Sequence, residues 1–141
     1  MGKILVVDDE KSIRLVLERL LKNDGHEVTV AENGQKAMEV ASKQFDLALL
    51  DINLGFGPNG IDVLEYLHQN YPETVIILLT GHATLETAVA ALRKGAHDYL
   101  FKPCQPDAIR ASVREGLQKK QSKQRQEQLI DRLEQNILST L

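Results

Sequence analysis

The sequence predicts an α/β fold in which helices cover both faces of one parallel β-sheet. Short apolar runs alternate with longer segments whose apolar residues recur at helical spacing, and turn-forming residues separate them. This alternation gives five strands and five helices in strict order. Such a pattern requires right-handed crossovers, and hence a doubly wound sheet. The chain has 141 residues, 43% of them hydrophobic, which suits a single domain with a substantial core.

Five segments are expected to be strands. Ile4–Val7, Leu47–Leu50 and Val75–Thr80 are continuous apolar runs, which is typical of strands buried on both faces of a sheet. Residues 27–31 alternate between polar and apolar side chains, so this strand should be more exposed. Tyr99–Phe101 is predicted as a short last strand.

The helical segments lie between these strands and end at turn residues. The clearest pattern is the first, with apolar residues at Ile13, Val16, Leu17, Leu20 and Leu21. Asp24 and Gly25 end that helix. Further helices are expected around residues 34–41, 61–67 and 85–92. Pro106 begins the fifth, a favoured place for proline.

Composition argues against several classes of protein. The formal net charge is −3 and the calculated isoelectric point is about 5.8, so no global basic field attracts nucleic acid or a membrane surface. The single cysteine, Cys104, excludes an internal disulfide and suits a reducing compartment. Met1 is followed almost directly by a strand, without a signal peptide, and no apolar run is long enough to cross a bilayer. We therefore expect a soluble cytoplasmic protein that does not itself bind nucleic acid.

Polar side chains follow the buried strands at one edge of the predicted sheet. Asp8 and Asp9 come after the first strand, Asp51 after the third, Thr80 ends the fourth, and Lys102 follows the fifth. Three crowded carboxylates repel one another unless a cation lies among them, and a few hard oxygen ligands suit Mg²⁺. One carboxylate could then act as a nucleophile toward a phosphoryl group, with the lysine and threonine stabilising its oxygens.

Each of these residues also has a simpler interpretation. Asp8 and Asp9 could cap the following helix, Thr80 could be an ordinary strand-end residue, and Lys102 could be solvated. The histidines His82 and His97 lack a matching cluster of metal ligands and are interpreted as surface residues, and Cys104 as an unreactive side chain. The joint occurrence at four strand ends favours a functional site.

Four motifs in this order resemble the receiver domains of two-component response regulators, over about residues 3 to 120. They are Ile4–Glu10, Leu49–Asp51, Leu79–Gly81 and Tyr99–Pro103. The resemblance implies a flavodoxin-like (βα)5 fold with spatial strand order 2-1-3-4-5. It also implies that a sensor histidine kinase supplies a phosphoryl group, and that the protein is a regulator rather than an enzyme, catalysing at most its own phosphorylation and dephosphorylation.

The resemblance assigns a role to each motif residue. It makes Asp51 the phosphoacceptor and Lys102 the lysine that contacts the phosphoryl group. The metal would be Mg²⁺, bound directly by Asp9 and Asp51, through a water by Asp8, and by the backbone carbonyl of Asn53. Two further residues, Thr80 and Tyr99, match the family's switch pair. The Lys102–Pro103 bond is expected to be cis.

The loop after the phosphoacceptor departs from the family pattern. Receivers commonly have a proline four residues after the phosphoacceptor and a glycine eight residues after it. Here the fourth position is Gly55, and the corresponding glycine is Gly60, one residue late. The loop between them is therefore expected to be enlarged and more flexible.

Two other functions are compatible with parts of this pattern. A phosphohydrolase of the haloacid dehalogenase type also places an aspartate nucleophile after a parallel strand, but it needs a second aspartate where this chain has Asn53. A flavodoxin-like cofactor binder would hold phosphate after its first strand, where Asp8, Asp9 and Glu10 would repel it. Both are less consistent with the sequence than a receiver.

The C-terminal segment is predicted to be helical. We expect a receiver domain at 1–120 and a helical linker or signal helix at 121–141, since good helix formers dominate there and proline is absent. Apolar residues return at coiled-coil spacing at Ile130, Leu133 and Ile137. This favours a homodimer through the helix, followed by an output domain that is expected to be transcriptional; the receiver surface could dimerise instead, or the helix could be a linker that frays alone.

Overall fold

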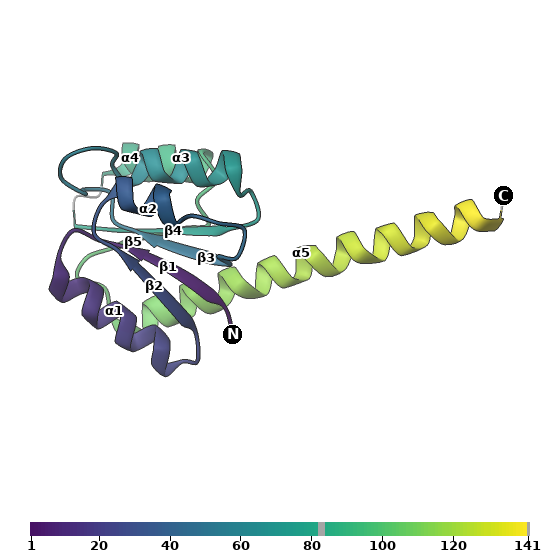
Figure 1. Cartoon of the computed structure of the whole chain (residues 1–141), viewed down its shortest axis with the longest axis horizontal. Coiled ribbons are helices and arrows are strands. Elements are labelled where there is room, and N and C mark those ends of the chain that lie inside the picture. The colour runs from purple at the N-terminus through teal and green to yellow at the C-terminus, as the bar shows by residue number, and fades with distance from the viewer. Residues whose placement is uncertain (82–83, 141) are drawn as a thin grey trace.

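The computed structural model describes residues 1–81 and 84–140, and confirms the predicted α/β fold (Figure 1). The described residues form one parallel sheet with strand order β2-β1-β3-β4-β5. Its strands are β1 (Lys3–Val7), β2 (Glu27–Ala31), β3 (Leu47–Leu50), β4 (Val75–Thr80) and β5 (Asp98–Phe101). The order and direction are those expected of a flavodoxin-like sheet.

Helices cover both faces of the sheet (Figure 1). They are α1 (Lys11–Asn23), α2 (Gly34–Val40), α3 (Gly60–Asn70), α4 (Leu85–Arg93) and α5 (Pro106–Thr140). Alternate residues of the central strands point to opposite faces, so the core has two halves. One half joins β1, β3 and β4 to α1 and α5, and the other joins the same strands to α2, α3 and α4.

The central strands are buried throughout, as their continuous apolar sequences predicted. Every residue of β3 and all but the first residues of β1 and β4 are buried. The edge strand β2 is more exposed, which agrees with its alternating pattern. Because the carboxyl ends of parallel strands share one edge, this packing brings the residues after β1, β3, β4 and β5 together.

Helix α5 is much longer than the domain needs. It packs on β3 and β4 through its first turns, and residues 121–139 are all exposed. Figure 1 shows this part projecting from the end of the sheet where the strands begin. The helical extension was predicted; its last residue, Leu141, lies outside the described residues. Within the described part of the chain, no helix combines the length and apolar character required to span a membrane.

Candidate metal centre

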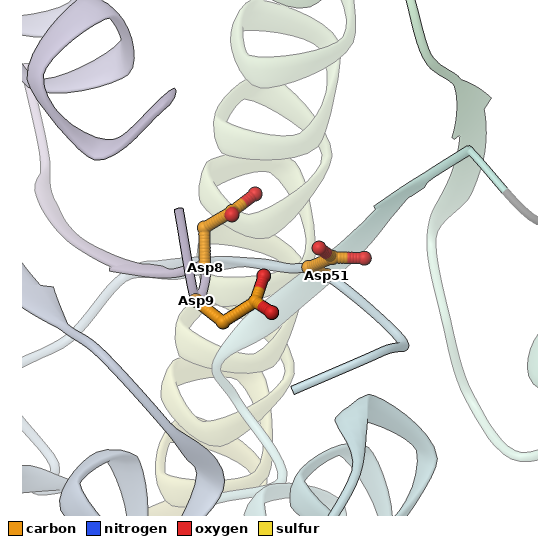
Figure 2. Close-up of side chains that lie close together, drawn as sticks. All are labelled: Asp8, Asp9 and Asp51. Atoms are coloured by element: carbon orange, nitrogen blue, oxygen red, sulfur yellow. The ribbon is translucent and has the colours of Figure 1, made fainter. Parts of the chain in front are cut away.

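Three aspartates meet where β1 and β3 end (Figure 2). Asp8 and Asp9 follow β1 and Asp51 follows β3, and each offers a carboxylate oxygen within 4.8 Å of the other two. Backbone pairing continues past the strands, because Asp51 N–H donates to the Val7 carbonyl at 2.9 Å and Asp8 N–H to the Ala31 carbonyl at 3.2 Å. The sheet therefore fixes the positions of two of these residues.

The carboxylates differ in exposure. Asp8 and Asp51 are buried, whereas Asp9 is exposed. Asp8 is further fixed by the turn that follows it, since its Oδ1 accepts a hydrogen bond from Glu10 N–H at 2.9 Å. Arg14 in α1 donates to the Asp8 carbonyl oxygen at 2.8 Å. The sequence does not predict this role of Arg14, because the helical pattern does not determine the conformation of an arginine side chain.

Lys102 links two of the carboxylates. It follows β5, and its backbone N–H donates to the Thr80 carbonyl at 2.8 Å. Its ammonium lies 2.7 Å from Asp8 Oδ2 and 3.1 Å from Asp51 Oδ2. The structure thus brings together Asp8, Asp9, Asp51 and Lys102, all of which the sequence singled out.

The charges of this cluster do not balance. Burial raises the pKa of the Asp51 carboxyl, with the charge of Asp8 adding to the effect, and Lys102 only partly opposes it. Burial lowers the pKa of Lys102, but its hydrogen bonds to Asp8 and Asp51 outweigh this, so the pKa is raised overall. One ammonium among three carboxylates leaves an excess of negative charge.

The donor set fits a divalent cation with a preference for oxygen. Ligand oxygens about 2.1 Å from Mg²⁺ lie at most about 4.2 Å apart, close to the spread of these carboxylates. Exposed Asp9 leaves this side of the cluster open to water, which Mg²⁺ usually retains in its coordination shell. Asp8, Asp9 and Asp51 are therefore the residues that would hold the ion, and neutralising the excess negative charge is what it would contribute.

The segment after Asp51 packs tightly against the start of α3. Asn53 N–H donates to Asp51 Oδ1 at 3.3 Å, and Gly60 N–H donates to the Ile52 carbonyl at 2.8 Å. A Cβ at Gly60 would collide with the Asp51 carbonyl oxygen and lie 2.7 Å from the Ile52 Cα. Both are backbone atoms, so a larger residue at this position would displace the segment that carries Asp51. Glycine is therefore required here although its φ is ordinary.

Thr80 and Tyr99 lie on adjacent strands, and both are buried. The Tyr99 hydroxyl is 2.9 Å from Thr87 Oγ1 in α4, and the Tyr99 ring meets Phe101 edge-on at 5.6 Å. Thr87 also completes the capping box of α4 with Thr84. Sequence reasoning missed Thr87; the signal available was its place three residues after a capping threonine.

The other candidate residues are not brought into the site. His97 is half-buried, and the carboxylate cluster, the only candidate metal group in the described part of the chain, contains no histidine. His82 lies outside the described residues. Burial, with the charge of Asp98, raises the pKa of the half-buried Cys104 thiol, which disfavours the reactive thiolate. The Lys102–Pro103 peptide bond is cis, as expected.

Fold and site together define a parallel α/β domain with a carboxylate cluster and a lysine at the carboxyl edge of its sheet. A family model, the response regulator receiver domain, matches residues 4–114. The chain therefore belongs to the response regulator receiver domain family. It is thus a receiver domain of two-component signalling, and the findings do not support the haloacid dehalogenase alternative.

Two curated relatives illustrate this membership. The chain is 38% identical over 131 residues to the alginate biosynthesis transcriptional regulatory protein AlgB of Pseudomonas aeruginosa. This alignment covers 92% of this chain and 29% of AlgB. It is 40% identical over 124 residues to the DNA-binding transcriptional regulator NtrC of Escherichia coli, with 87% of this chain and 26% of NtrC covered. The chain thus spans less than a third of the curated relatives it matches.

Solved structures agree with this result. NtrX from Brucella abortus superposes with a TM-score of 0.85 at 32% identity, covering 92% of this chain and 30% of NtrX. A CheY-like receiver domain from Methanospirillum hungatei JF-1 superposes with a TM-score of 0.80 at 32% identity, covering 87% of this chain and 98% of that one.

Proposed function

We propose that Asp51 is the phosphoacceptor of this receiver, and that a sensor histidine kinase is the donor. The observation that carries the proposal is the buried Asp51 carboxylate, which shares Lys102 with Asp8 and lies within 4.8 Å of Asp9. In this arrangement the nucleophile is held by the sheet, and the Lys102 ammonium lies beside it, where incoming phosphoryl oxygens could contact it.

The reaction is the transfer of a phosphoryl group to a carboxylate. An Asp51 carboxylate oxygen attacks phosphorus as the bond to the donor nitrogen of a phosphohistidine breaks, and that nitrogen keeps the electron pair. In this proposal the Lys102 ammonium, 3.1 Å from Asp51 Oδ2, moves to the incoming phosphoryl oxygens, and the hydroxyl of Thr80, the last residue of β4, donates to one of them. When bound, Mg²⁺ supplies neutralisation of the remaining charge.

The proposed function also includes a set of ligands for Mg²⁺. Asp9, Asp51 and the Asn53 backbone carbonyl would hold Mg²⁺, and Asp8 would act mainly through a metal-bound water. The order of exposure is consistent with this, since Asp9 faces solvent while Asp8 is buried against Lys102. The bound phosphoryl group then shifts the positions of Thr80 and Tyr99, which act as the switch.

The signal passes to an output domain that controls transcription. AlgB and NtrC, named as transcriptional regulators, are matched over only 29% and 26% of their lengths, which is consistent with a separate output region. We propose a receiver domain at 1–120 and a signal helix at 121–141, with two copies pairing along Ile130, Leu133 and Ile137. All three are exposed apolar residues on the projecting part of α5. The protein acts in the cytoplasm as a regulator, and its only catalysis concerns its own phosphorylation state.

A small-molecule phosphodonor tests the central claim. The protein is incubated with acetyl phosphate, with Mg²⁺ or with EDTA, and then analysed by intact-mass spectrometry and peptide mapping. We expect one added phosphoryl group, on Asp51, only when Mg²⁺ is present. Phosphorylation at another residue would contradict the assignment. Rapid hydrolysis of p-nitrophenyl phosphate would instead favour a phosphohydrolase.

A further inference from the structure

The loop between β3 and α3 carries an unusual side chain. Phe56 stands five positions after Asp51 and is fully exposed to solvent, the most exposed large apolar side chain in the described ranges. The only aromatic pair within those ranges joins Tyr99 and Phe101, so Phe56 stacks on no other ring. The tip of the loop therefore presents a large apolar surface that the domain itself does not cover.

Two glycines isolate this side chain. Gly55 and Gly57 have φ values of 75° and 85°, in the left-handed region that favours glycine. A Cβ at either position would have no neighbour within 4 Å, so neither glycine is needed for close packing. Their shared property is the backbone conformation, which turns the chain sharply on each side of Phe56.

Both ends of the loop are nevertheless firmly held. Leu54 is buried in the core half that contains α2, α3 and α4. The Pro58 carbonyl oxygen lies where a Cβ at Gly34 would be, so α2 packs directly on the loop. Asn59 and Asp62 then cap α3 reciprocally, with hydrogen bonds of 2.9 and 3.0 Å. Only Gly55, Phe56 and Gly57 project, and they project from a fixed base.

We propose that Phe56 anchors the protein that donates the phosphoryl group, by entering an apolar pocket beside that protein's phosphohistidine. This rests on the proposed function, and deepens it by naming a residue that selects the donor. The loop begins with Asp51 itself and leaves the same edge of the sheet, so any protein that presents a phosphohistidine to Asp51 must come close to it. An aromatic side chain carried on a loop whose two ends are held can bury a large apolar area at the margin of such a contact.

The proposal separates two kinds of phosphodonor. Acetyl phosphate offers no protein surface that could enclose Phe56 when it reacts at Asp51, whereas the proposal has a protein donor bury this side chain. Loss of Phe56 should therefore slow transfer from a protein and leave the small donor unaffected. If the loop instead closed over Asp51, removing the Phe56 side chain would alter both the rate of the reaction with acetyl phosphate and the lifetime of the phosphorylated protein.

The test compares Phe56→Ala, Phe56→Tyr and, as a matched control, Leu138→Ala, which removes an exposed apolar side chain from the far end of α5. The donors are acetyl phosphate and a panel of purified, autophosphorylated sensor histidine kinase fragments, of which the fastest donor to the unaltered protein is used. We expect Phe56→Ala to lower kcat/KM for that kinase by about tenfold or more. Phe56→Tyr should restore most of it, and Leu138→Ala should have no effect.

Two results would overturn the proposal. One is an unchanged kcat/KM for the kinase with Phe56→Ala. The other is a changed rate with acetyl phosphate or a changed phosphoryl lifetime in that variant, which would assign the loop to Asp51 itself. Failure of the proposed function has a different signature, because the unaltered protein would then take no phosphoryl group from acetyl phosphate.

Discussion

Each end of the sheet carries an aspartate paired with a lysine, and the two pairs behave in opposite ways. At the carboxyl edge, Lys102 lies 3.1 Å from Asp51. At the opposite edge, where α5 leaves the domain, Lys120 lies 2.8 Å from Asp46. The pKa of Asp51 is raised and that of Asp46 is lowered. The distance between two charges therefore does not decide which protonation state the fold favours.

The surroundings of each pair explain the difference. Asp51 is deeply buried, shares its lysine with Asp8, and has that second carboxylate as a neighbour. The Asp46 side chain is 37% exposed, and two donors serve it, since Lys120 binds Oδ1 and the Lys3 N–H binds Oδ2, both at 2.8 Å. Burial opposes the Asp46 charge, but these hydrogen bonds outweigh it. The carboxyl edge at Asp51 thus has an excess of negative charge that a cation could neutralise, whereas the charge of Asp46 at the opposite edge is neutralised within the protein.

Replacing each of the two aspartates with asparagine should give the largest contrast. Asp51→Asn removes the nucleophile with almost no change in volume, so phosphorylation by acetyl phosphate should fall below detection while the fold persists. Asp46→Asn makes the same chemical change at the other edge and should leave phosphorylation intact. Intact-mass spectrometry measures phosphorylation and circular dichroism checks the fold. Full phosphorylation of the Asp51→Asn variant would contradict the assignment of Asp51 as the phosphoacceptor.

The excess charge at the carboxyl edge should appear as affinity for Mg²⁺. Asp9→Ala removes the exposed carboxylate, and we expect the Kd for Mg²⁺ to rise at least as much as the roughly 10- to 100-fold that loss of an outer-shell group costs. Isothermal titration calorimetry gives the value. Glu10→Ala is the control, because this neighbouring acid is exposed but outside the cluster. Equal affinities for Asp9→Ala and the unaltered protein would refute the role of Asp9.

The sequence predicts the carboxyl edge far better than the opposite one. Strand ends in an alternating fold must share an edge, so the order of the strands alone groups Asp8, Asp51 and Lys102. In the sequence Asp46 is only the residue before a strand, because its partner Lys120 lies 74 positions away and no local pattern connects them. The capping pattern could have identified Thr87 but not its contact with Tyr99, because that contact depends on a side-chain rotamer and on the placement of α4.

Beyond the Asp46–Lys120 pair, helix α5 projects from the domain and is exposed over residues 121–139. Replacing Ile130, Leu133 and Ile137 with Ser removes the exposed apolar stripe, so a dimer held by the helix should dissociate toward monomer. Sedimentation velocity over a range of concentrations measures this. As a control, replacing the polar residues Gln126, Asp131 and Asn136 with Ser should leave the sedimentation coefficient unaltered. A triple Ser variant of the apolar positions that sediments like the unaltered protein would place any dimer contact on the receiver itself.

A smaller effect is expected at the switch. Tyr99 is already turned inward and bonded to Thr87, so a phosphoryl group on Asp51 would strengthen or shift an existing contact rather than move an exposed ring. Thr80→Ala should still accept a phosphoryl group, but the amide chemical shifts around Tyr99 and Thr87 should move less on phosphorylation. If those shifts move equally in both proteins, the coupling does not pass through the Thr80 hydroxyl.

The smallest effect concerns stability and pH at the Asp46 edge. Because the pKa of Asp46 in the folded protein lies below its ordinary value of 3.8, the charged carboxylate stabilises the fold above that pH. This stabilising contribution is lost as the pH falls below 3.8 and through the folded-state pKa of Asp46.

The charge of Asp46 contributes at most about 1 kcal/mol to stability, since more than a third of its side chain is exposed. Asp46→Asn should therefore lower the free energy of unfolding at pH 7 by up to that amount, and the difference from the unaltered protein should shrink as the pH falls below 3.8. Urea titrations followed by circular dichroism measure both, and Lys120→Gln should follow the same course, because it removes a donor that lowers the pKa. A difference between Asp46→Asn and the unaltered protein that does not shrink as the pH falls from 7 to well below 3.8 would show that the carboxylate acts through its shape and hydrogen bonds rather than through its charge.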